Sequence, residues 1–191
     1  LQKAEFFFQR CLGISQEGQW LAGELEANLA LGVVYEEEGE THAAIDCYER
    51  RIDLAGQAGL SLEQDTAYVN LTAVYLRQAQ VQESTGDRAA ALTSYAKCLS
   101  AAERCSDMAT AAQCHYRTGM LYYEQKAHPE AISSLRRFMD LSEHLGDKEA
   151  EGTAYTTFSA CLQELGDVEG AVASLEEYLQ VGACCKRATL L

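Results

Sequence analysis

The sequence contains almost no proline and no long apolar run. Pro129 is the single proline among 191 residues, and the few helix breakers leave room for long helices. No stretch approaches the roughly 18 consecutive apolar residues of a membrane span. No run alternates apolar and polar residues as a strand would, and the first residues do not resemble a signal peptide. We therefore expect an all-α, soluble protein of the cytoplasm.

Basic residues are also scarce relative to acidic ones. The chain has 29 Asp and Glu against 15 Lys and Arg, which gives a formal net charge of −14. A surface of that sign repels the phosphates of nucleic acids and the headgroups of anionic membranes. The composition therefore argues against nucleic-acid and membrane partners, and it favours a basic or helical segment of another protein.

Motifs for catalysis or cofactor binding are missing as well. The four histidines are scattered, and no Gly-rich phosphate loop is present. The eight cysteines lack the paired Cys-x-x-Cys spacing of a zinc site, so we interpret Cys11, Cys47 and Cys98 as small packing residues. Runs of glutamate are interpreted as solvated helix faces. We predict that the protein is not an enzyme and needs no metal or cofactor.

What the sequence does contain is an internal repeat. The motif Ala-x-x-x-[aromatic or Leu]-x-x-x-[Ile, Leu or Met] occurs five times, with starts separated by 40, 47, 40 and 40 residues. Residues four apart lie on one face of a helix, so each copy predicts a helix. A period of this length is typical of solenoids. The five copies start at Ala4, Ala44, Ala91, Ala131 and Ala171.

A second helical segment precedes four of these helices. Its signature is a small residue with an aromatic residue three positions later, as in Gly32 with Tyr35 and Gly119 with Tyr122. Small residues let antiparallel helices approach closely, and the aromatic ring fills the gap between neighbouring pairs. The predicted structural anchors are Ala4, Phe8, Gly32, Tyr35, Ala44, Tyr48, Ala91, Tyr95, Gly119, Tyr122, Ala131 and Ala171.

The helix pairs predict how the chain is divided. Each pair buries its apolar face mainly against its neighbours, so we expect a single repeat domain over residues 1–191. The longer third spacing predicts a first helix from near Asp65 to about Thr85, lengthened by about two turns. An unpaired first helix and the lack of a polar capping helix suggest a fragment of a longer protein. The expected repeats lie near residues 1–18 (a half repeat), 22–58, 63–106, 108–145 and 148–184.

The pattern resembles the tetratricopeptide repeat family. Leu31-Gly32-x-x-Tyr35, a turn at Gly39-Glu40 and Ala44-x-x-x-Tyr48 follow the helix-turn-helix phrase of that family. The resemblance implies a right-handed superhelical solenoid of about four full repeats plus an N-terminal half repeat. It also implies a non-catalytic scaffold or adaptor for protein-protein interaction.

In such solenoids the first helix of each pair lines a concave groove, which supplies candidate contact residues. Tyr116, Met120 and Tyr123 form a stripe that serves either a partner or an adjacent helix, because aromatic and Met side chains suit both. Arg77 and Arg117 occupy matching places, where they hold a partner carboxylate or are simply solvated. The predicted partner-binding residues are Leu29, Val33, Glu36, Glu37, Arg77, Gln80, Glu83, Tyr116, Arg117, Met120, Tyr123, Glu124, Gln163 and Glu164.

Within the family, the chain is similar to axonemal members of motile cilia and flagella. The shared features are the phrase Phe7-Phe8-Gln9-Arg10-Cys11-Leu12 before a Leu-Gly-x-x-Tyr-Glu-Glu-x-Gly repeat, the long helix after Asn70-Leu71, and the regular spacing that follows. This resemblance implies a subunit of the axoneme associated with an inner-arm dynein heavy chain and with a partner that bears a zinc finger.

A second group of relatives leaves an alternative open. The phrases at residues 48–55 and 145–155 also resemble cell-polarity scaffolds that link the mitotic spindle to G-protein subunits. Those scaffolds carry an Asn after the Leu-Gly pair, where this chain has Val33, Met120 and Ala160. The alternative is a soluble polarity or trafficking adaptor that binds partner peptides in its concave groove.

Overall fold

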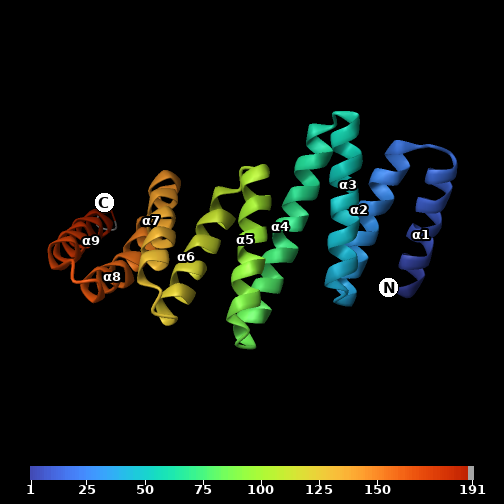
Figure 1. The fold of residues 1–191 in the computed structure, drawn as a ribbon. Coiled ribbons are helices and arrows are strands. Elements are labelled where there is room, and N and C mark those ends of the chain that lie inside the picture. Colours follow the sequence, from blue (N-terminus) through green and yellow to red (C-terminus); the bar gives the residue numbers. More distant parts are fainter. Residues whose placement is uncertain (189–191) are drawn as a thin grey trace. The chain divides into compact units, whose positions relative to one another are not determined.

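The computed structural model describes residues 1–188, with side chains up to Leu179, and this part of the chain is helical throughout (Figure 1). The predicted all-α class is confirmed, since no strand occurs in the described chain. Nor does any described helix have the length and apolar content to cross a bilayer. The helices are α1 (Gln2–Glu17), α2 (Leu21–Glu38), α3 (Thr41–Ala58), α4 (Ser61–Ser84), α5 (Arg88–Arg104), α6 (Met108–Glu124), α7 (His128–Leu145), α8 (Lys148–Glu164) and α9 (Val168–Ala188).

Local sequence explains where the helices begin and end. The Asp107 and Asp147 carboxylates each accept a backbone N–H three residues later, at 3.0 Å, and so cap the first turns of α6 and α8. Gly39 ends α2 with a φ of 79°, a left-handed conformation that glycine adopts without steric cost. Within each compact unit, these short connections turn a helix back against the one before it.

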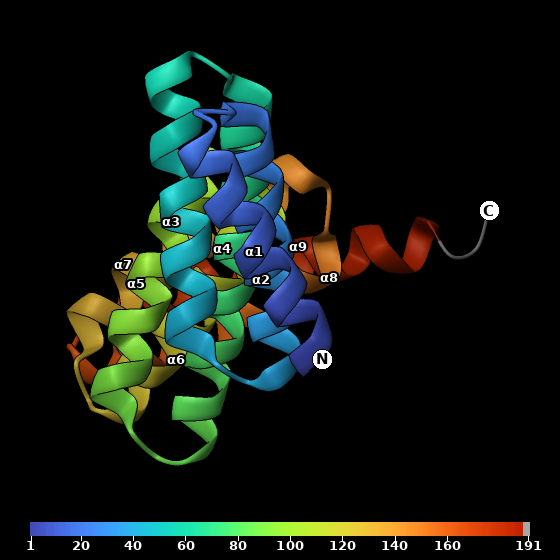
Figure 2. The same ribbon diagram turned by 90° about the vertical axis from the view of Figure 1, so that its right-hand side faces the viewer.

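Two compact units make up the chain, and each is described by itself. Unit 1 comprises residues 1–106, in which each of α1 to α4 packs against the next helix along the chain. Figure 2 shows α2 and α3 of this unit side by side. Unit 2 begins at Asp107, and α6 packs on α7, α7 on α8 and α8 on α9. The expected single domain and its repeat boundaries stay predictions.

Two of the predicted small residues lie where the helices of a pair are in close contact. A Cβ atom on Gly32 would overlap the ring of Tyr48, and one on Gly119 would lie 2.8 Å from Cγ of Leu135. Tyr48 and Leu135 are fully buried, and each belongs to the second helix of its pair. A side chain at either glycine would therefore collide with the second helix of the pair.

Helix α4 is the long helix that the third spacing predicted. It has 24 residues, whereas α2 has 18 and α6 has 17. The expected end near Thr85 is close, but the helix begins four residues before Asp65, at Ser61. Gly59 ends α3 with a φ of 70°, so the chain re-enters a helix almost at once. Leu62 is exposed in this first turn, so the turn does not follow the spacing of the buried apolar residues and was not predicted.

Helix α1 differs from its counterparts. Ala4 and Phe8 are only half-buried and Cys11 is exposed, whereas Cys98, at the matching place in α5, is fully buried. The packing interpretation is therefore wrong for Cys11. The physical reason is that α1 packs mainly against α2, so its other side lacks a neighbour within unit 1.

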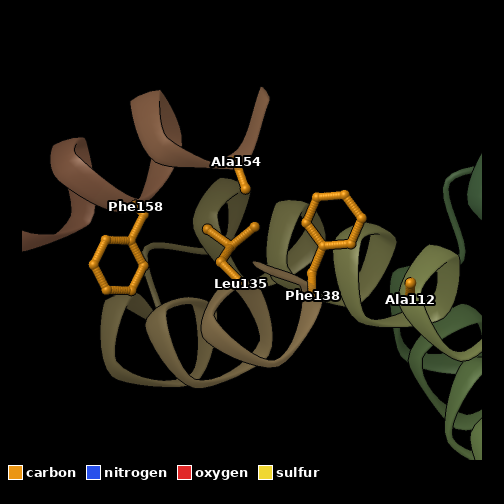
Figure 3. Packing of buried hydrophobic residues seen from close by; sticks show 5 residues of the cluster. All are labelled: Ala112, Leu135, Phe138, Ala154 and Phe158. Atoms are coloured by element: carbon orange, nitrogen blue, oxygen red, sulfur yellow. The ribbon is translucent and has the colours of Figure 1, made fainter. Parts of the chain in front are cut away.

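The core of unit 2 collects apolar side chains from three helices. Figure 3 shows five buried members of this cluster: Ala112 of α6, Leu135 and Phe138 of α7, and Ala154 and Phe158 of α8. Tyr116 is among the half-buried residues packed against the cluster. This core fixes the end of α7 and the start of α8 beside α6.

Candidate partner-binding faces

In unit 1 the predicted contact residues lie on α2 and α4, the first helices of two pairs. Val33 is 43% exposed, and Glu37 and Gln80 are exposed as well. Leu29 is half-buried beneath them. We call the exposed surface of α2 and α4 the first-helix face of unit 1.

Two of the predicted residues on this face are joined to each other. Nη2 of Arg77 lies 2.8 Å from Oε2 of Glu36, which links α4 to α2. The other oxygen of Glu36 accepts the hydroxyl of Tyr48 at 2.5 Å. One carboxylate thus connects three helices, and the Arg77 guanidinium has an intramolecular carboxylate partner. Contact of these residues with another protein stays a prediction.

The same phenol-carboxylate pairing occurs in the next repeat. The hydroxyl of Tyr95 donates to Oε2 of Glu83 at 2.6 Å, and both pairs span 12 residues. Burial, together with the hydrogen bond to Glu36, raises the pKa of Tyr48 well above its usual range. The phenol therefore stays protonated and keeps donating at neutral pH. Glu36 and Glu83, predicted as partner-binding residues, thus accept the hydroxyls of the buried tyrosines.

In unit 2 each residue of the predicted aromatic stripe touches an adjacent helix. The ring centroid of Tyr116 lies 5.0 Å from that of Phe138, and the Tyr123 ring lies 6.0 Å from the ring of His128. Thr157 of α8 donates to Sδ of Met120 at 3.7 Å. All three stripe residues are half-buried and retain exposed surface. Arg117, Glu124, Gln163 and Glu164, the remaining predicted residues of unit 2, are exposed.

A cleft of about 430 Å³ opens beside Tyr116, within the range of volumes that protein clefts use for ligands. Its walls are α6, the end of α7 and the start of α8, and they include Phe138, Leu145, Asp147 and Ala150. The sequence indicated Tyr116 but missed these other residues, because they lie outside the repeated anchors. One feature of the sequence could have indicated the cleft: Ala112 has a small side chain at a position where another repeat has a leucine.

Three segments of the chain match models of the tetratricopeptide repeat. The matches cover residues 28–61, 72–105 and 113–141, which together make just over half of the chain. The chain belongs to the tetratricopeptide repeat family. Proteins of this family are scaffolds for protein interaction and are typically non-catalytic.

The curated relatives include Tetratricopeptide repeat protein 29 of Homo sapiens and of Macaca fascicularis. Each is 24% identical to this chain over 183 residues, which is 92% of the chain and 38% of the relative. The chain thus spans well under half the length of these relatives. They are longer members of the same family.

Solved structures agree on the fold. BtubC (BKLC) from P. vanneervenii gives a TM-score of 0.55 at 18% identity, covering 97% of this chain and 74% of that structure. The MamA protein gives 0.50 at 11% identity, covering 95% of this chain and 93% of that structure. At these identities the likeness shows the fold alone.

Proposed function

We propose that this chain is a non-catalytic scaffold subunit of the motile ciliary or flagellar axoneme, associated with an inner-arm dynein heavy chain and with a zinc-finger-bearing subunit. Support for the axonemal assignment comes from the phrase at residues 7–12 and the long helix after Leu71. The 24% identity to Tetratricopeptide repeat protein 29 over 183 residues adds to it.

One observation carries the scaffold part of the proposal. Some apolar side chains on the first helices are exposed and so do not take part in packing between repeats. Examples are Val33 (43% exposed) of α2 and Val69 (50% exposed) of α4. Exposed apolar surface framed by polar residues marks contact sites for other proteins. Glu37, Gln80 and the Arg77–Glu36 pair are the polar residues on the same two helices.

The mechanism that fits this surface is rigid presentation. Tyr48 and Tyr95 tie first helices to second helices through Glu36 and Glu83, so the positions of the exposed residues are fixed before a partner arrives. A preorganised surface loses little conformational entropy on binding. The scaffold therefore needs no chemical step to hold its partners in fixed positions.

The test is an affinity purification of the full-length protein from ciliated cells, after salt extraction of axonemes, with the bound proteins identified by mass spectrometry. We expect the protein to remain with the microtubule doublets once membrane and soluble matrix are removed, and a dynein heavy chain to copurify. Recovery of G-protein or spindle components without dynein would instead favour the soluble polarity or trafficking adaptor.

A further inference from the structure

The place in unit 1 that corresponds to the unit 2 cleft holds a larger side chain and a cation. Gly32 and Gly119 occupy the same place in their repeats, and counting from them aligns Leu25 with Ala112 and Arg51 with Phe138. Leu25 and Arg51 are both 3% exposed. The junction of α2, α3 and α4 therefore contains a buried leucine side chain and a buried arginine.

Arg51 also links two helices of that junction through hydrogen bonds. Its Nη1 donates to the carbonyl oxygen of Leu25 on α2 at 2.8 Å, and its Nε donates to the carbonyl oxygen of Glu63 on α4 at 3.4 Å. In unit 1 the slot thus contains an aliphatic group and a cation supplied by the chain itself.

In unit 2 the same slot lacks both groups. Ala112 replaces the leucine, Ala150 stands at the place of Glu63, and the Phe138 ring packs against Tyr116. The space that remains is the cleft of about 430 Å³. Its lining is mostly apolar, and Asp147 is the one charged residue among the side chains that line it.

The charge of the lining indicates the kind of partner. Asp147 uses Oδ1 to accept the N–H of Ala150, and a carboxylate has a second oxygen with which to bind a cation. The whole chain carries a formal net charge of −14, which attracts basic segments and repels acidic ones. An apolar group with a neighbouring cation therefore complements this slot.

We propose that the unit 2 cleft receives one aliphatic side chain, of leucine, isoleucine or methionine, from a basic segment of a partner protein. The incoming side chain occupies the space that Leu25 fills in unit 1, and a lysine or arginine beside it meets Asp147. This inference rests on the proposed scaffold function and specifies the chemistry of one partner contact.

The test begins with a library of random 12-residue peptides displayed on phage and selected on the whole chain. We expect enrichment of peptides in which an aliphatic residue neighbours Lys or Arg. An enriched peptide is then synthesised with a fluorophore, and its Kd is measured by anisotropy. Ala112→Leu, which gives unit 2 the residue that unit 1 has in this slot, should weaken binding at least ten-fold.

Two further variants guard against a trivial loss of folding. Ala109→Leu places bulk at the exposed lining of the cleft and should also weaken binding, while the control Ala96→Leu, exposed on α5 of unit 1 and outside the first helices, should leave the Kd unchanged. Asp147→Asn keeps a helix cap but removes the charge. It should weaken binding of the basic peptide about three-fold and reduce the salt dependence of that binding. Binding of a peptide whose Lys is replaced by Gln should not change.

Several outcomes would overturn the proposal. Enrichment of acidic peptides, failure to enrich any peptide, or unchanged binding by folded Ala112→Leu and Ala109→Leu would each contradict it. A dimer that dissociates on Ala112→Leu, with no peptide bound, would assign the cleft to a second copy of the chain. Loss of dynein from the axonemal purification, with peptide binding intact, would refute the axonemal assignment and leave the cleft in place.

Discussion

The junction of α2, α3 and α4 in unit 1 and the junction of α6, α7 and α8 in unit 2 share one backbone plan but differ in what lies inside. Arg51 closes the first by donating to Leu25 and Glu63. The second contains the Phe138 ring and an open cleft. Because the anchors Ala44 and Ala131 are fully buried in both, the difference between the two junctions lies at the non-anchor positions.

The largest effect in this comparison should come from Phe138→Ala. Phe138 is buried in one cluster with Leu135 and Phe158, packs against Tyr116 and lines the cleft, so its truncation would extend the cleft into the core. We expect a loss of about 3–5 kcal/mol in the free energy of unfolding, measured by urea denaturation followed by circular dichroism. Val69→Ala, at an exposed site, is the control. A loss of less than about 1 kcal/mol would show that the unit 2 core repacks around the cleft.

The corresponding change in unit 1 should cost less and should depend on the replacement. Arg51→Ala removes two hydrogen bonds from a charged donor, so we expect unfolding to become easier by about 2–3 kcal/mol. Arg51→Met keeps an apolar stem in the slot and avoids burying a cation, so its stability should stay within about 1 kcal/mol of the original. Equal losses for both variants would mean that the hydrogen bonds, rather than the filling of the slot, close this junction.

A smaller effect is expected at the phenol-carboxylate pairs, which unit 1 has and the Leu135 repeat lacks. Tyr48→Phe preserves the buried ring but removes the donor to Glu36, at an expected cost of about 1–1.5 kcal/mol. Arg77→Ala, which removes the exposed ion pair to the same carboxylate, should cost less than about 0.5 kcal/mol. Denaturation of both single variants and of the double variant would show whether the two contacts on Glu36 are coupled.

Sequence reasoning succeeded where the repeat imposes a period. The alanine anchors and the glycines at Gly32 and Gly119 recur because close helix contacts demand small residues, and these positions predicted the helix pairs. The cleft was not predictable in the same way, since it depends on a difference between copies at Ala112 and Phe138 rather than on their likeness. The Arg77–Glu36 pair spans 41 residues, and only the packing of α2 beside α4 brings those side chains together.

The smallest effect at neutral pH, and the most general one, concerns two tyrosines, one in each unit. Burial, helped by Glu49, raises the pKa of Tyr75 to about 12, and burial with Glu151 does the same for Tyr155. An unfolded tyrosine titrates near pH 10, so the folded state binds these protons more tightly than the unfolded state does. Their contribution to stability is complete below about pH 10 and declines as the pH rises toward 12.

The measurement is urea denaturation at pH 8, 10 and 11 for the unmodified chain, Tyr75→Phe, Tyr155→Phe and the double variant. A phenylalanine has no proton to lose, so each variant should lose less stability between pH 10 and 11 than the unmodified chain. The two effects should add, because the residues lie in separate compact units with separate carboxylate partners. An unchanged pH dependence in the double variant would assign the alkaline loss to other groups, such as Tyr48, whose pKa is raised further by burial beside Glu36.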